Sequence, residues 1–179
     1  MRVCLLLILA AYLGGCASPS VAPREYLDEQ TAATITVVAE PWIFTRQDAP
    51  RQFDFFNLYA IDVNRMGDHK KYLVVVQYWP EAGQRGVPAL ELNGPSRQLA
   101  LQAVNQTARE LGVAQPLDET APDSARYWFY PIDDAALKEF AKARELTATL
   151  VAEQVRTPYV VWRDGSLALS EFAGVAREQ

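Results

Sequence analysis

Cysteine is almost absent from this chain. Its 179 residues include two cysteines, Cys4 and Cys16, and both lie within the first sixteen positions. The rest of the chain therefore has no thiol that could form a disulfide bond, hold a zinc ion or act as a nucleophile. A domain built from that part must be stabilised by its apolar core, and the chain is long enough for one domain of ordinary size.

Histidine occurs once, at His69, beside Asp68 in a segment that is predicted to form a hairpin turn. Neither a His-x-x-Glu-His nor a Gly-x-Ser-x-Gly pattern occurs, and one histidine without a thiol cannot build an ordinary zinc site. We therefore predict no metal and no cofactor. A histidine at the tip of a hairpin is usually just solvated, although a catalytic role in a concave pocket is the alternative.

The chain also lacks a run of basic residues. Its formal net charge is −5, and no basic cluster is longer than His69-Lys70-Lys71. A surface with scattered charges and a net negative sign does not attract nucleic acid or anionic lipid headgroups. We exclude nucleic acid as a partner.

Long hydrophobic runs are missing as well. The longest, Val3–Leu13, has eleven residues and follows the single cation Arg2. As a helix it would span about 17 Å, which is too short for a hydrocarbon core of about 30 Å. These dimensions fit a secretory signal peptide and not a stable transmembrane helix.

The run ends in Leu13-Gly14-Gly15-Cys16, which resembles the lipobox of bacterial lipoproteins. The resemblance implies that residues 1–15 are a signal peptide, that cleavage occurs between Gly15 and Cys16, and that Cys16 carries a diacylglyceryl group. It also implies further acylation of the new amine in many Gram-negative species. Ala17 stands where an aspartate commonly retains lipoproteins in the inner membrane, which favours the periplasmic face of the outer membrane in a Gram-negative host. The alternative is an ordinary signal that is cut at a small residue.

Residues 16–30 are predicted to be the lipidated cysteine and a flexible tether. Ala17–Pro23 consists of small residues, serine and proline, and at about 3.5 Å per residue it reaches at most about 25 Å. The reach would be about 50 Å if order began only near Thr31. The folded part would therefore stay close to its bilayer, and a partner would have to meet it there.

Strand patterns dominate residues 31–179, which we predict to form one globular α+β domain. Phe53–Asn64 and Lys70–Trp79 are largely apolar on both alternating faces and flank the five-residue turn Arg65–His69. This pattern is typical of a hairpin at the centre of a sheet. Further strands are predicted at Thr34–Ala39, Trp42–Thr45, Ala89–Leu92, Arg97–Gln102, Ala125–Tyr130, Glu145–Ala152 and Tyr159–Trp162, and one helical turn at Ala108–Leu111.

Two helices are predicted near the C-terminus, one capped by Asp133 or Asp134 and one after Asp164-Gly165-Ser166. A Leu-x-x-Phe-Ala sequence at Leu137–Ala141 recurs at Leu169–Ala173, which suggests that the two helices pack side by side. The predicted fold is a mostly antiparallel sheet of about seven to nine strands with these two helices on one face.

Paired carboxylates give little support to an enzyme. Asp54 and Asp62 are eight residues apart on one predicted strand, or about 26 Å, whereas a glycosidase needs two carboxylates about 5–10 Å apart. Helix capping explains Asp133-Asp134, and a loop explains Asp118-Glu119.

Aromatic side chains are the stronger candidates for a binding site. Trp42, Trp79, Trp128 and Trp162 lie in or at the ends of predicted strands, where they could line a groove for a glycan, a peptide or a lipid. The alternative is that these rings form the core. We predict a non-enzymatic binding or scaffolding module, anchored in the membrane by the lipid on Cys16, whose unknown protein, peptide or glycan partner meets the groove or a sheet edge. The rival hypothesis is a membrane-tethered envelope hydrolase that uses Asp residues with His69.

Overall fold

The structure is a computed structural model that describes residues 21–48, 54–78, 86–95, 97–143 and 145–175. The predicted signal peptide, Cys16 and Trp79 lie outside the described residues. Within these ranges the chain forms ten strands and three helices. The strands are β1 (Arg24–Asp28), β2 (Ala33–Val37), β3 (Trp42–Arg46), β4 (Phe55–Arg65), β5 (Asp68–Gln77), β6 (Ala89–Asn93), β7 (Gln98–Leu101), β8 (Arg126–Pro131), β9 (Thr147–Ala152) and β10 (Val155–Arg163), and the helices are α2 (Ala108–Leu111), α3 (Asp134–Ala141) and α4 (Ser166–Phe172).

Strands β4 and β5 form the centre of an open sheet. Strand β5 pairs with one edge of β4, while β2 and β3 share the other edge. Residues 56–61 and 72–78 are all buried, as the apolar character of both faces requires. The predicted central hairpin is confirmed. So is the mostly antiparallel α+β class, because all the strand pairs in the described residues are antiparallel.

The turn of this hairpin is shorter than the sequence predicts. Arg65 pairs with Asp68, so that Met66 and Gly67 alone form the loop. Their φ angles of 53° and 91° place both residues in the left-handed region, which two-residue type I′ hairpin loops require. The five-residue turn was wrong because polar residues that look like a loop continue the ladder of hydrogen bonds.

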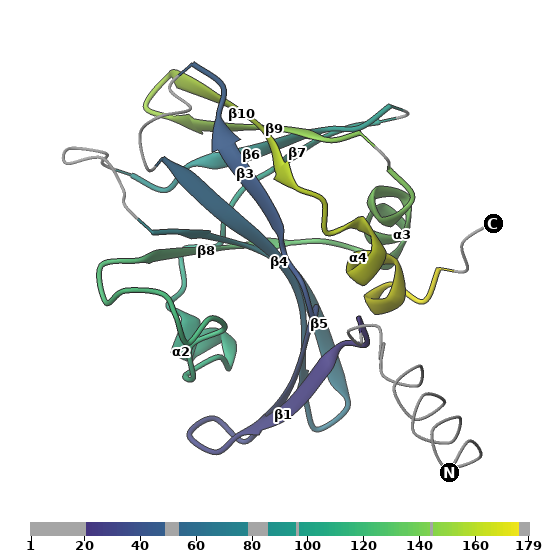
Figure 1. The fold of residues 1–179 in the computed structure, drawn as a ribbon. Coiled ribbons are helices and arrows are strands. Elements are labelled where there is room, and N and C mark those ends of the chain that lie inside the picture. The colour runs from purple at the N-terminus through teal and green to yellow at the C-terminus, as the bar shows by residue number, and fades with distance from the viewer. Residues whose placement is uncertain (1–20, 49–53, 79–85, 96, 144, 176–179) are drawn as a thin grey trace, which may run out of the picture.

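The sheet curls strongly, as Figure 1 shows. From β8 its strands run in the order β8-β5-β4-β3-β10-β9-β6-β7. The two ends of this path approach each other, since the Val104 amide donates to the Phe129 carbonyl at 2.9 Å and the Tyr130 hydroxyl to the Pro88 carbonyl at 3.0 Å. Buried apolar side chains lie on both faces of the central strands β4 and β5.

The tenth strand, β1, is the one that the sequence did not predict. Its residues Arg24–Asp28 pair with β2, although the sequence places them in the tether. The folded part therefore includes residues before Thr31, and the sheet has ten strands instead of seven to nine. Four of the five residues in β1 are not buried, so no apolar run indicates this strand.

Helices α3 and α4 lie next to each other in Figure 1. The Ser170 hydroxyl of α4 donates to the Ala141 carbonyl at the end of α3, at 2.8 Å, which confirms that the two helices pack side by side. Asp133 caps α3 by accepting a hydrogen bond from the Ala136 amide at 2.7 Å. The predicted helical turn at Ala108–Leu111 is also present, as α2. No helix in the described part of the chain is long and apolar enough to cross a membrane.

Candidate functional site

A cavity of about 410 Å³ opens where the start of β3 meets the ends of β6 and β10 and the start of β9. We call it the Trp42 cavity. Its lining combines apolar side chains with two carboxylates, an amide and a hydroxyl. The lining residues are Trp42, Asn93, Gly94, Pro95, Glu145, Leu146, Thr147, Val161 and Asp164.

A close backbone contact positions Asp164 at this cavity. A Cβ atom on Gly165 would lie 2.7 Å from both the Pro41 carbonyl carbon and the Trp42 amide nitrogen, so only glycine allows the segment between β10 and α4 to approach β3. Asp164 is then fixed in a tight turn, because its Oδ1 accepts the Ser166 amide at 2.7 Å. The Asp164 side chain thus stands at the cavity beside Trp42.

Trp42, which lines the cavity, carries a buried polar atom without a partner among the described residues. Its side chain is 2 % exposed and stacks on Phe44 with ring centroids 6.0 Å apart. Its Nε1 is buried and donates to no acceptor among the described residues. An indole nitrogen is a donor only, and leaving a buried donor unpaired costs about 1–3 kcal/mol.

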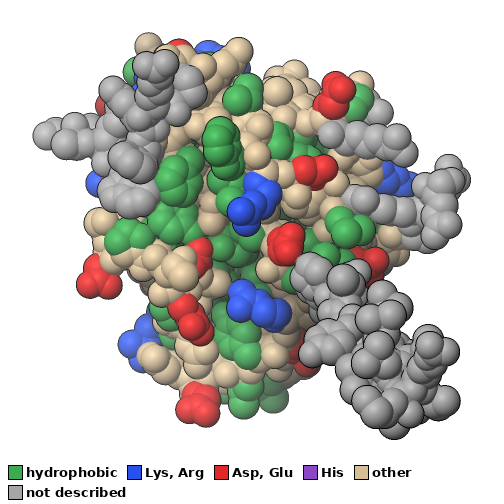
Figure 2. Space-filling model, viewed as in Figure 1, with side chains coloured by type: hydrophobic (Ala, Val, Ile, Leu, Met, Phe, Trp, Pro, Cys, Tyr) green, Lys and Arg blue, Asp and Glu red, His purple; other side chains and the backbone are tan. Residues whose placement is uncertain are grey.

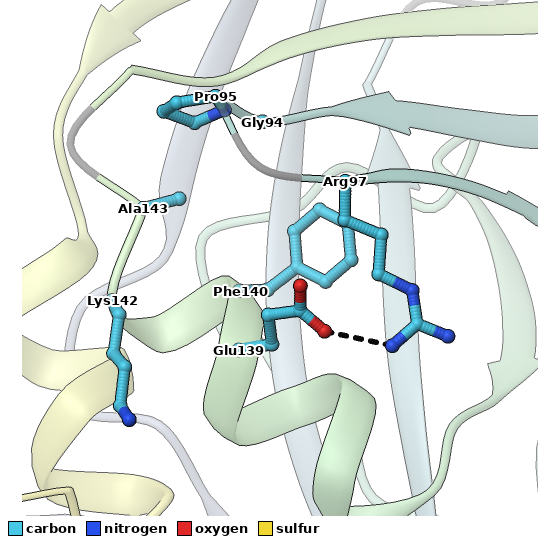
Figure 3. A pocket seen from close by; sticks show the side chains of 7 residues that line it. All are labelled: Gly94, Pro95, Arg97, Glu139, Phe140, Lys142 and Ala143. Atoms are coloured by element: carbon cyan, nitrogen blue, oxygen red, sulfur yellow. Dashed lines mark hydrogen bonds and ion pairs between the residues drawn. The ribbon is translucent and has the colours of Figure 1, made fainter.

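A second cavity of about 200 Å³ adjoins the first and shares Gly94 and Pro95 with it. Its lining adds Arg97, Glu139, Phe140, Lys142 and Ala143, and we call it the Phe140 cavity. Figure 3 shows Arg97 facing Glu139 of α3, while Lys142 extends away from that pair. Arg97 Nη1 lies 2.7 Å from Glu139 Oε2, and this contact raises the pKa of Arg97.

The predicted tryptophans occupy different environments. Trp42 lines the larger cavity. Trp128 is 7 % exposed and belongs to the core, whereas Trp162 is 75 % exposed and lines neither cavity. Trp79 lies outside the described residues. The structure does not bring the three described rings together in one groove.

His69 lies in β5 opposite Asn64 and not in the turn. Its Nδ1 is 3.0 Å from Oδ2 of Asp62, and half of its side chain is exposed. Asp62 also lies 3.8 Å from Lys71 Nζ. His69 lines neither of the two cavities.

Three further carboxylates act as structural acceptors. Asp28 is fully buried and accepts four backbone N–H groups. Asp54 accepts the Tyr159 hydroxyl at 3.0 Å and lies 3.3 Å from Arg46 Nη1. Asp118 accepts the hydroxyl groups of two tyrosines of the central hairpin, Tyr59 and Tyr78. The oxygens of these three carboxylates already accept hydrogen bonds or an ion pair from the protein itself. A structural role therefore explains the three residues better than a catalytic role does.

Burial acts to raise the pKa of Asp118, but hydrogen bonds from Thr120, Tyr78 and Tyr59 outweigh it, so that its pKa is lower than usual. The same balance lowers the pKa of Asp28. Neither group would be protonated near neutral pH, as a general acid must be. Figure 2 shows acidic and basic side chains dispersed over the visible face, without a concentration of one sign.

The sequence indicates Trp42 as a site residue through its type and its place at the start of a strand. It does not indicate Glu145, Thr147 and Asp164, because their proximity depends on pairings between strands that are distant in the sequence. No group of three or more metal-ligating side chains occurs in the described part of the chain. Comparisons with protein-family models, with curated proteins and with solved structures find no match for this chain.

Proposed function

We propose that this protein is a lipid-anchored envelope lipoprotein that acts as a non-enzymatic binding module at the periplasmic membrane face, with the Trp42 cavity as its binding site. One observation carries the proposal: a cavity of about 410 Å³ has a lining that combines apolar side chains, such as Leu146 and Val161, with a few polar ones. Cavities of this size, with an apolar lining and a few convergent polar groups, are typical of ligand sites.

The anchor rests on the resemblance of Leu13–Cys16 to a lipobox. Two or three acyl chains hold a protein on a membrane persistently, and a short tether keeps the folded part near the surface. Labelling of growing cells with an alkyne fatty acid tests this part. Cys16→Ala is expected to lose the label and to leave the membrane fraction, whereas Cys4→Ala keeps both. A Cys16→Ala protein that stays in the membrane fraction would contradict the anchor.

The packing of both C-terminal helices on one face of the sheet is part of the same proposal. The buried Leu137 and Phe140 of α3 and Leu169 of α4 belong to the same apolar cluster as Phe44 of β3 and Leu92 of β6. This arrangement would close one end of the curled sheet beside the two cavities.

Photocrosslinking in the native envelope tests the binding site. Thr147 is exposed at the rim of the Trp42 cavity, so a benzoylphenylalanine at this position is expected to capture one discrete partner or ligand. The same probe at Met66, fully exposed in the β4–β5 turn, is the matched control. Equal capture from both positions, or none from Thr147, would contradict the proposal.

A tethered hydrolase that uses Asp residues with His69 is the second candidate. The contact between His69 and Asp62 at 3.0 Å favours it, because a carboxylate can orient a catalytic imidazole. Its test is hydrolysis of envelope esters and glycans by the full chain and by His69→Ala. Turnover that disappears in this variant supports the hydrolase, and equal turnover by both proteins excludes His69 from the reaction.

A further inference from the structure

Two large apolar side chains lie exposed where β10 ends and α4 begins. Trp162 is 75 % exposed and Leu167 is 45 % exposed, and we call these two residues the Trp162 patch. The turn between them is tight, because Asp164 Oδ1 accepts the Ser166 amide at 2.7 Å, so both residues lie at the same end of the sheet. Tryptophan side chains are highly buried on average, which makes the exposure of Trp162 unusual.

A bulge in β10 accounts for the position of Trp162. Val161 pairs with Phe44 of β3 and Arg163 pairs with Ile43, so that the register shifts between Val161 and Arg163. Trp162 is therefore an additional residue without a partner in β3. Bulges of this kind redirect a side chain while the strands on either side stay paired. The fold thus presents an indole ring to the outside at this point.

The chain that precedes β1 joins the folded part at the same end of the sheet. Arg24, the first residue of β1, pairs with Val37 of β2, and Pro41 follows four positions later. A Cβ atom on Gly165, directly before α4, would lie 2.7 Å from the Pro41 carbonyl carbon. These contacts place the start of β1 within about 25 Å of the turn before α4, and Figure 1 shows the start of β1 near α4.

The lipid proposed on Cys16 would hold this end of the sheet close to a bilayer. Val21 is already partly buried against the core, so that five residue steps separate it from Cys16. Five residues span at most about 18 Å when fully extended. The surface of the anchoring bilayer would therefore lie within this distance of Val21.

We propose that the Trp162 patch docks on the lipid bilayer that holds the anchor, with the Trp162 indole among the headgroups and Leu167 against the acyl chains. An indole suits this position, because its ring is apolar and its N–H can donate to headgroup oxygens or water. This inference rests on the proposed function, since the anchor supplies the proximity. The anchor also makes the contact intramolecular, so that a small patch is sufficient.

The other large exposed side chains lie at different ends of the sheet. Val155, which is 65 % exposed, begins β10 and is about 23 Å from Trp162 along the strand. Met66 lies at the tip of the β4–β5 hairpin, five positions beyond Ile61, which pairs with Val37. The position of the tether therefore selects the Trp162 patch from among the exposed apolar side chains.

The charges at this end of the sheet do not favour an anionic surface. Exposed residues of both signs occur there, among them Arg24, Arg163, Glu40 and Asp164. Attraction to anionic headgroups would therefore contribute little, and the contact is expected to be the same at low and high salt.

The test is quenching of tryptophan fluorescence by lipids with brominated acyl chains. The lipidated protein is purified from membranes and reconstituted into vesicles of phosphatidylethanolamine and phosphatidylglycerol, with and without bromine. The difference between the parent and Trp162→Phe isolates the emission of Trp162, because the other tryptophans are common to both proteins. This emission is expected to be blue-shifted and quenched at both salt concentrations, and Leu167→Ser is expected to weaken the quenching.

The matched control is Trp162→Phe combined with Met66→Trp, which moves the indole to the hairpin tip. Both substituted side chains are exposed, so the variant is expected to fold like the parent, and its added indole is expected to escape quenching. Quenching of equal size at the two positions, quenching that high salt abolishes, or an unquenched Trp162 would overturn the inference.

Flotation of the same vesicles tests the anchor separately. Protein that floats with an unquenched Trp162 keeps the proposed anchor and loses the docking contact, whereas lack of flotation contradicts both. Quenching of Trp162 without capture from Thr147 supports the docking contact and contradicts the proposed binding site.

Discussion

The Tyr59 hydroxyl donates a hydrogen bond to Oδ2 of Asp118 at 2.9 Å, although the two residues are 59 positions apart in the chain. The same oxygen accepts the Tyr78 hydroxyl, and Asn57 donates to Tyr78 at 2.7 Å. This cluster fixes the segment between α2 and β8 over one face of the central hairpin. The side chains of Tyr59 and Tyr78 are almost fully buried as a result.

Asp118→Asn is expected to destabilise the protein by about 1–3 kcal/mol, because two buried hydroxyl groups lose their charged acceptor. Urea unfolding monitored by circular dichroism measures the loss. Glu119→Gln is the control, since Glu119 is exposed beside Asp118. A loss of similar size in both variants would show that the tyrosine contacts are not the cause.

Acid is expected to destabilise the protein through Asp28. Burial acts to raise the pKa of Asp28, but hydrogen bonds from the amides of Gln115, Ala114, Gln30 and Thr31 outweigh it and lower the pKa. The unfolded chain then binds a proton more readily than the folded chain. This contribution to stability is present above about pH 4 and is lost as the pH falls through the folded-state pKa.

The measurement for Asp28 is the free energy of unfolding between neutral and acidic pH. Asp28→Asn is expected to be less stable than the parent at neutral pH, and its stability is expected to fall less on acidification. Parallel curves for the two proteins would contradict the role assigned to this carboxylate.

Gly165→Ala is expected to lower the melting temperature and to disturb Trp42. The added Cβ would lie 2.7 Å from backbone atoms of Pro41 and Trp42, a distance at which the two segments must separate. Gly94→Ala is the matched control, because its Cβ would lie 3.6 Å from Ala143 Cβ, an ordinary contact. Thermal unfolding and the Trp42 indole resonance measure both effects. An unperturbed Gly165→Ala would contradict the close contact.

Met66→Gly is expected to stabilise the central hairpin slightly. Met66 has a φ of 53° and a fully exposed side chain, so glycine removes backbone strain without a loss of packing, an effect of about 1 kcal/mol or less. Gly67→Ala, at a φ of 91°, is expected to destabilise. Urea unfolding of the two variants gives the signs, and equal signs would contradict the type I′ turn.

The sequence predicts those elements of the fold whose pattern of residues lies within the element itself. Strands β4 and β5 were predictable because both of their faces are apolar, and α3 because Asp133 caps an amphipathic stretch. Strand β1 was not, since it forms from Arg24–Asp28 only by pairing with β2 and has little apolar character. The same limit applies to the site.

The Trp42 cavity depends on four strands and on the turn before α4. No spacing in the sequence connects Trp42 with Glu145 and Asp164, which are more than one hundred positions away. In the sequence, Gly165 indicates only the start of a helix. Its second role, the close approach to Pro41, becomes visible once β3 and β10 are known to pair.

The central claim is that the Trp42 cavity binds a partner or ligand at the membrane face. The most direct measurement is capture by benzoylphenylalanine at Thr147 in the native envelope, compared between the parent, Gly94→Ala and Gly94→Leu. Gly94 lines both cavities, so a leucine there fills space that a ligand needs. We predict one discrete adduct in the parent and in Gly94→Ala that disappears in a folded Gly94→Leu protein. An adduct of undiminished yield in Gly94→Leu would contradict the account.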